Sequence, residues 1–109
     1  MGFVYLLIAV DDSGLETHKI GVTKNSVLKR VKQLSTGSSG KIDILHIYES
    51  INYKLVEQWL HGHYFMAKTT SNNEWFKLSN EDVFNFIPNC KKADEIVSLM
   101  LKENPFFKK

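Results

Sequence analysis

The chain has 109 residues, a length that fits one domain with one hydrophobic core. Hydrophobic residues make up 43% of it, which excludes global disorder. The formal net charge of +2 is too small for a uniformly basic nucleic-acid binder, so any such contact must come from a local patch. The single cysteine, Cys90, excludes an internal disulfide and fits a reducing cytoplasm, where we expect the protein to act.

The first part of the chain predicts two antiparallel strands. Residues 3–10 are a continuous apolar run, typical of a buried strand. The run is too short to cross a bilayer and no basic segment precedes it, so we expect neither a membrane segment nor a signal peptide. After a turn at 11–14, residues 18–22 predict the second strand. Gly21 inside it indicates a bulge or a close backbone approach.

The middle of the chain predicts two helices separated by a strand. Asn25 or Ser26 can cap the first helix, whose apolar residues recur at helical spacing. Residues 42–48 alternate imperfectly and predict a third strand. Residues 52–65 form the longest helical pattern, with one broad apolar face.

The last part predicts a short strand at 74–78 and two helices. Ser79 is a capping signal, with an acidic residue three positions later. Pro88 and Asn89 are expected to break the chain before an amphipathic helix at 91–102. The elements together predict an α+β domain with a small, about three-stranded antiparallel sheet flanked by helices.

Five polar residues sit where they could converge on a site. They are Tyr5, Lys19, Arg30, Glu57 and His61. Taken singly, each has an ordinary structural explanation: a strand aromatic, an edge-strand charge, an arginine lying over the core, or a solvated helix pair. Arg30 falls at the edge of the apolar stripe of its helix. Glu57 and His61 lie at the rim of the apolar face of the helix expected at 52–65.

The ordered set resembles the GIY-YIG nuclease domain, in the branch found in phage and fungal proteins. The resemblance covers roughly residues 3 to 86, and the order and spacing of five short motifs carry it. These motifs are Phe3-Val4-Tyr5-Leu6-Leu7, Lys19-Ile20-Gly21-Val22-Thr23, Leu28-Lys29-Arg30-Val31-Lys32-Gln33-Leu34, Glu57-Gln58-Trp59-Leu60-His61 and Glu74-Trp75-Phe76.

The resemblance implies a role for each matched residue. Tyr5 matches the tyrosine of the first motif, Gly21 the glycine of the second, and Arg30 the helical arginine. Glu57 matches the glutamate that binds one divalent metal ion, and His61 a histidine common in this branch. On this basis residues 1–90 form the nuclease domain, and residues 91–109 add a C-terminal helix and tail packed on the same domain.

Three positions depart from the family pattern. Phe3 replaces the glycine of the first motif, and Lys19 replaces the tyrosine of the second, which removes one phenol from the site. The asparagine found late in the family's sequences has no clear counterpart. Asn72 or Asn73 could take its place, although an asparagine in a loop more often serves to form a turn.

The matched groups suit metal-dependent hydrolysis of a nucleic-acid phosphodiester. Mg²⁺ or Mn²⁺ on Glu57 would stabilise charge, and Arg30 would hold a phosphoryl oxygen with its planar donors. Tyr5 is the expected base, because neighbouring positive charge can favour a phenolate, while His61 is either an assistant or the base itself. Lys24, Lys29 and Asn73 are further expected substrate contacts.

Other functions remain open at this stage. One is a catalytically inactive module on the same fold that binds nucleic acid or a protein. Another is an adaptor that docks through the helix at 91–102, and a thiol nucleophile at Cys90 is discounted because no signature surrounds it. The resemblance favours DNA over RNA. For target choice three alternatives stay open: the chain acts with little sequence preference, a homodimer or a separate targeting partner supplies the choice, or the chain is a piece of a longer protein.

Overall fold

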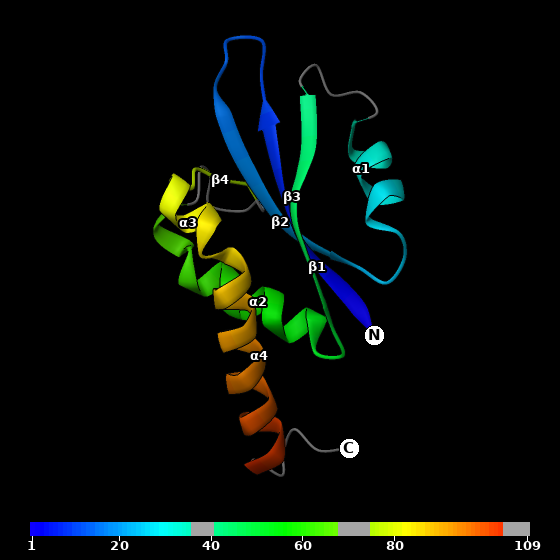
Figure 1. Ribbon diagram of the computed structural model, residues 1–109, viewed down its shortest axis with the longest axis vertical. Helices are drawn as coiled ribbons and strands as arrows, with labels where there is room; N and C mark the ends of the chain where they lie inside the picture. Colours follow the sequence, from blue (N-terminus) through cyan, green and yellow to red (C-terminus); the bar gives the residue numbers. More distant parts are fainter. Residues whose placement is uncertain (36–40, 68–74, 104–109) are drawn as a thin grey trace.

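The computed structural model describes residues 1–35, 41–67 and 75–103. The strands are β1 (Gly2–Val10), β2 (Glu16–Thr23), β3 (Lys41–Ser50) and β4 (Trp75–Phe76). The helices are α1 (Val27–Ser35), α2 (Tyr53–His63), the 3-10 helix η1 (Phe65–Ala67), α3 (Asn80–Phe84) and α4 (Phe86–Glu103). The arrangement confirms the expected α+β class, with helices flanking an antiparallel sheet (Figure 1).

The sheet has the strand order β3-β1-β2-β4, and the two described residues of β4 form its fourth strand. β1 is central and pairs with β2 and β3 along its whole length. β4 pairs with β2 at two positions, where Lys19 is opposite Trp75 and His18 is opposite Phe76. Lys19 therefore lies inside the sheet, and its interpretation as an edge-strand charge is wrong.

Each face of the sheet packs against different helices, because successive side chains of a strand point to opposite sides. Val4 and Leu6 belong to a cluster that also contains buried residues of α2 and α4. Tyr5 and Leu7 form a second cluster with Val27 of α1. Figure 1 shows α1 on one side of the sheet and α2, α3 and α4 on the other. Tyr5 is thus on the α1 face.

A β-bulge explains why β3 alternates imperfectly. The pairing of β1 with β3 shifts register between Leu6 and Leu7, which leaves Leu45 as the extra residue. Ile44, before the bulge, packs in the cluster on the α1 face, whereas Tyr48, after it, packs in the cluster on the opposite face. Even-numbered residues therefore change faces in the middle of the strand.

Local hydrogen bonds fix the two helix starts that the sequence predicts. Ser79 and Asp82 form a reciprocal capping box, with both bonds at 3.1 Å, at the start of α3. At the start of α1, the Lys29 backbone N–H donates to Ser26 Oγ at 3.4 Å. Ser26, rather than Asn25, is therefore the residue that caps α1.

The expected chain break at Pro88 and Asn89 is wrong, because α4 begins at Phe86 and runs through both residues. Pro88 is the third residue of the helix, and a first-turn residue needs no backbone N–H for an intrahelical bond. α4 buries Ala93 and Val97 against the rest of the domain. Within the described ranges, no helix has both the length and the apolar character needed to cross a membrane.

Candidate functional site

Tyr5 and Gly21 lie opposite each other in β1 and β2 and form the base of the candidate site. Tyr5 is only 1% exposed. A Cβ atom added to Gly21 would lie 2.6 Å from Cζ of Tyr5, so only glycine leaves room for the phenol here. This confirms the close approach expected at Gly21. The bulge considered there is excluded, because β1 and β2 pair without a register shift.

Lys19 lies two residues before Gly21 and on the same face of β2. It is buried, at 8% exposure, and its Nζ atom lies 5.6 Å from the centroid of the Trp75 ring. A cation over an aromatic face is attracted by the ring quadrupole. Trp75 is half-buried and holds this ammonium group on the face that carries Tyr5.

Glu57 and His61, one turn apart in α2, meet β2 at the residue before Gly21. The Nε2 atom of His61 lies 3.1 Å from the carbonyl oxygen of Ile20. Because a carbonyl oxygen can only accept, Nε2 is the nitrogen that carries the proton. The same Nε2 lies 3.8 Å from Oε2 of Glu57, and the two side chains are 18% and 17% exposed. The predicted pair is therefore anchored to the β2 backbone.

We call Tyr5, Lys19, Gly21, Glu57 and His61 the β2 centre. A phenol and an ammonium lie on the α1 face of one strand segment, and the imidazole of His61, with the Glu57 carboxylate beside it, contacts that segment from α2 on the other face of the sheet. Among the described residues, no group of three or more His, Cys, Asp or Glu side chains could hold a metal ion. A single carboxylate fits Mg²⁺, which keeps much of its shell as water and substrate phosphate.

Arg30 lies beside this centre in a polar hollow of about 470 Å³. We call this hollow the α1 pocket; it is lined by Thr23, Asn25, Ser26, Lys29, Arg30 and Gln33. Arg30 is exposed, and its Nη1 donates to Oε1 of Gln33 at a long 3.5 Å. Val27, one turn earlier in α1, packs in the cluster that contains Tyr5. The structure therefore places Arg30 in the α1 pocket, whose lining residues include none of the β2 centre.

The remaining predicted contacts divide into three cases. Lys29 lines the α1 pocket, whereas Lys24 is exposed and is not among its lining residues. Asn73 and its neighbour Asn72 lie outside the described residues. Sequence reasoning missed Gln33, although its spacing of three from Arg30 on a helix is the signal that places the two side chains together.

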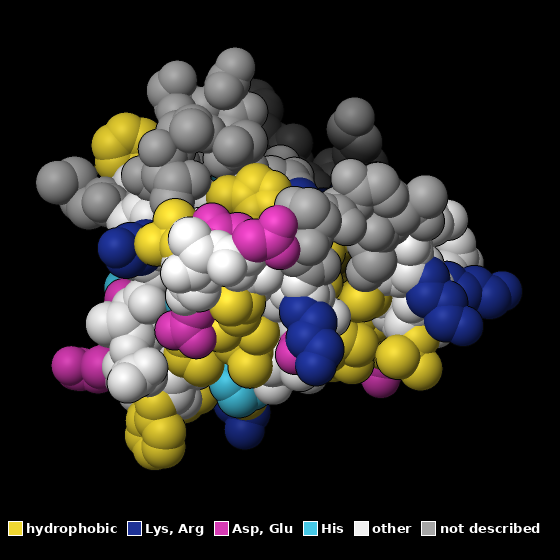
Figure 2. Space-filling view, turned by 90° about the horizontal axis from the view of Figure 1, so that it is seen from above, with side chains coloured by type: hydrophobic (Ala, Val, Ile, Leu, Met, Phe, Trp, Pro, Cys, Tyr) yellow, Lys and Arg dark blue, Asp and Glu magenta, His cyan; other side chains and the backbone are white. Residues whose placement is uncertain are grey.

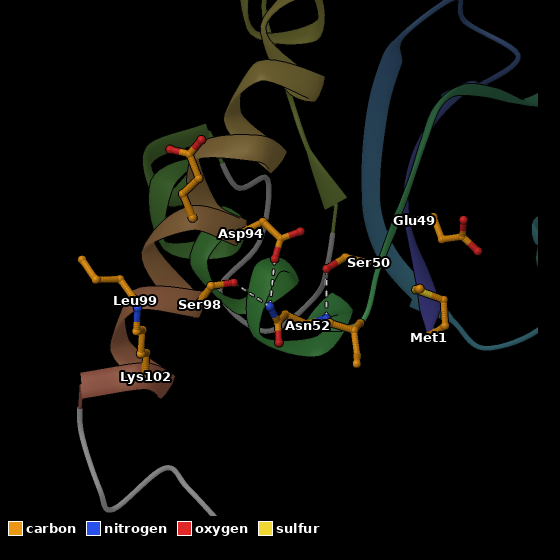
Figure 3. Close-up of a pocket in the computed structure, with 10 residues that line it drawn as sticks. Met1, Glu49, Ser50, Asn52, Asp94, Ser98, Leu99 and Lys102 are labelled. Carbon is orange, nitrogen blue, oxygen red and sulfur yellow. Dashed lines mark hydrogen bonds between the residues drawn. The ribbon is translucent and has the colours of Figure 1, made fainter.

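A second hollow, of about 650 Å³, lies far along α4 and contains none of the predicted site residues. Figure 3 shows Asn52 at its floor, with its side-chain amide donating to Asp94 at 2.9 Å and to Ser98 at 3.1 Å. Tyr48 donates to the same carboxylate at 2.7 Å. Burial alone would raise the pKa of Asp94, but these hydrogen bonds outweigh it and leave the pKa lowered. The network joins α4 to the β3–α2 junction and is structural.

Cys90 and His18 are buried titratable groups that belong to neither the β2 centre nor the α1 pocket. Burial, together with the nearby charge of Asp94, raises the pKa of the Cys90 thiol to about 12, which makes it unsuited to act as a nucleophile. His18 accepts a hydrogen bond from the Leu78 backbone N–H at its Nδ1 atom, at 3.3 Å. Burial is the largest effect on His18 and lowers its pKa.

The fold and site define a small α+β domain with polar and ionisable groups gathered at one strand of its sheet. The sequence matches the T5orf172 domain over residues 2–91, and the chain belongs to this family. The domain is phage-associated and described as nuclease-like, which points to a nuclease or DNA-binding role. No curated protein and no solved structure matches the chain.

Proposed function

We propose that this chain is a metal-dependent endonuclease of the GIY-YIG type that hydrolyses a phosphodiester bond in DNA. The observation that carries the proposal is that Gly21 makes room for the phenol of Tyr5, while His61, beside Glu57, contacts the carbonyl oxygen of the preceding residue, Ile20. A structural ion pair or a core tyrosine would not by itself require a glycine opposite the phenol. Membership of a nuclease-like family supports the same chemistry.

We assign each group a role in this reaction. Tyr5 takes the proton of the attacking water as the water oxygen bonds to phosphorus and the bond to the leaving oxygen breaks. Lys19 places an ammonium group on the same face of the sheet, over the ring of Trp75. Arg30 holds a phosphoryl oxygen through its planar donors. His61 orients Glu57, because its Nε2 proton is committed to Ile20.

Glu57 is the residue that would hold the divalent ion. Its carboxylate is largely shielded and has the imidazole of His61 beside it, which fits one inner ligand of a weakly held Mg²⁺ or Mn²⁺. When bound, the ion would neutralise negative charge on the phosphoryl group.

Nicking of supercoiled plasmid in Mg²⁺, in Mn²⁺ and in EDTA at low salt tests the proposal. We expect metal-dependent nicking by the wild type and its loss in Glu57→Gln and Tyr5→Phe. Tyr53→Phe is the matched control, because it also removes the hydroxyl of a buried tyrosine but in the cluster on the opposite face. Circular dichroism checks that all three variants remain folded.

The alternative is an inactive member of the fold that binds nucleic acid. The 1% exposure of Tyr5 favours this alternative, since a base must reach its water. A folded wild type that binds DNA and RNA but cuts neither in any metal would contradict the nuclease proposal and establish the alternative. Nicking that survives Tyr5→Phe would instead remove Tyr5 from the role of base.

A further inference from the structure

The α1 pocket is a polar hollow whose lining carries positive charge only. Lys29 and Arg30 are its two cations, and the other described residues that line it are neutral side chains with hydroxyl or amide groups. Figure 2 shows the largest group of Lys and Arg side chains on the side of the molecule where α1 lies in Figure 1. A cavity with this lining attracts an anion and offers it hydrogen-bond donors.

Local hydrogen bonds hold the backbone of the pocket in place. The Asn25 backbone N–H donates to Thr23 Oγ1 at 3.1 Å, and the Arg30 backbone N–H donates to the Ser26 carbonyl oxygen at 3.2 Å. The guanidinium of Arg30 uses one donor on Gln33, at 3.5 Å, out of the five that arginine possesses. The hollow is therefore prearranged, and most donors of Arg30 are left for an anion.

The pocket continues the β2 centre along the same face of the sheet. Thr23 follows Gly21 by two residues and pairs with Phe3, which packs in the cluster of Tyr5. Two residues of a strand span about 7 Å, because the rise is ~3.3 Å per residue. Phosphates of one DNA strand succeed each other every ~3.4 Å along the helix axis, so this distance corresponds to one or two nucleotides.

We propose that the α1 pocket binds a backbone phosphate one or two nucleotides away from the phosphate that is cut, with Lys29 and Asn25 as its specific contacts. The inference rests on the proposed nuclease function, which identifies the bound ligand as a DNA strand. It implies that the substrate is a polynucleotide rather than an isolated phosphodiester. Arg30 lines the pocket, and in the proposed reaction it also holds an oxygen of the phosphate that is cut.

Binding of a fluorescein-labelled DNA duplex, measured by anisotropy in EDTA at several salt concentrations, tests the proposal without cleavage. We expect Lys29→Ala to weaken binding about tenfold and to lower the slope of log affinity against log salt by about 0.9, the value for one lost phosphate contact. Asn25→Ala should weaken binding about threefold with the slope unchanged, because it removes a neutral hydrogen bond.

Lys32→Ala is the matched control, since Lys32 is exposed on the same helix but is not a lining residue of the pocket. Equal losses for Lys24→Ala, Lys29→Ala and Lys32→Ala, with no effect of Asn25→Ala, would overturn the proposal in favour of a diffuse basic surface. A wild type that binds with the expected pattern but never cuts would contradict only the nuclease function. Cutting that is accompanied by unchanged binding in Lys29→Ala and Asn25→Ala would contradict only the pocket.

Discussion

The Nε2 atom of His61 donates a hydrogen bond to the carbonyl oxygen of Ile20 at 3.1 Å, which ties α2 to the strand that carries Gly21. This bond assigns the proton to Nε2. The Oε2 atom of Glu57 lies 3.8 Å from the same nitrogen. His61, which the sequence offers as an alternative base, is therefore held against the backbone of β2.

We predict that His61→Gln keeps a measurable part of the nicking activity, because a glutamine amide can also donate to the Ile20 carbonyl oxygen. His61→Ala should lose more activity and lower the free energy of unfolding by about 1–3 kcal/mol, because it removes the donor that pairs with the buried carbonyl oxygen of Ile20. Plasmid nicking and urea denaturation measure the two effects. A loss of ~100-fold or more in a folded His61→Gln protein would assign the base to His61 instead.

Gly21→Ala should displace the Tyr5 ring, because the added methyl would lie 2.6 Å from its Cζ atom. We expect destabilisation of about 1–3 kcal/mol, typical of overpacking in a well-packed interior, together with loss of nicking. Gly62→Ala is the control, because no atom of the described residues lies within 4 Å of a Cβ at that helical position. It should be stabilising, by up to ~1 kcal/mol. Thermal and urea denaturation compare the two, and equal effects would show that the phenol does not need the space.

Stability should fall as the pH drops below neutrality because of His18. Its lowered pKa means that the folded protein binds this proton less readily than the unfolded chain, where histidine titrates near ~6.5. As the pH falls through that value toward the folded pKa, the unfolded chain is protonated first, and the free energy of unfolding decreases.

Urea denaturation between about pH 7.5 and 5.5 measures this loss. In His18→Gln the amide oxygen can accept from the Leu78 N–H, and the decrease over this window should shrink. An identical decrease in the variant would assign the pH dependence to other groups.

Cys90 should resist thiol reagents in the folded protein at neutral pH. The thiol is fully buried and its pKa is raised to about 12, so little thiolate forms and reagents cannot reach it. Labelling by iodoacetamide, followed by mass spectrometry, should be slow in buffer and rapid in concentrated urea. Rapid labelling in buffer would mean that α4 opens readily.

Local patterns determined most of the secondary structure. Periodicity located the strands and the two long helices, and capping chemistry located the start of α3 at Ser79. Pro88 misled the prediction, because a proline signals a break only when it falls beyond the first turn of a helix. The bulge at Leu45 could not be read from the sequence either, since it is defined by the partner strand.

The sequence by itself determined which residue types could serve a nuclease, and their order was enough to indicate a nuclease-like family. Only the tertiary structure decided how they group: Gly21 makes room for the phenol of Tyr5, and Lys19 packs on Trp75. The tertiary structure also places Lys29 among the lining residues of the α1 pocket and leaves Lys24 out of that lining. The physical reason is that strand pairing and helix packing join residues far apart in the chain, whereas sequence patterns report only neighbours within a few residues.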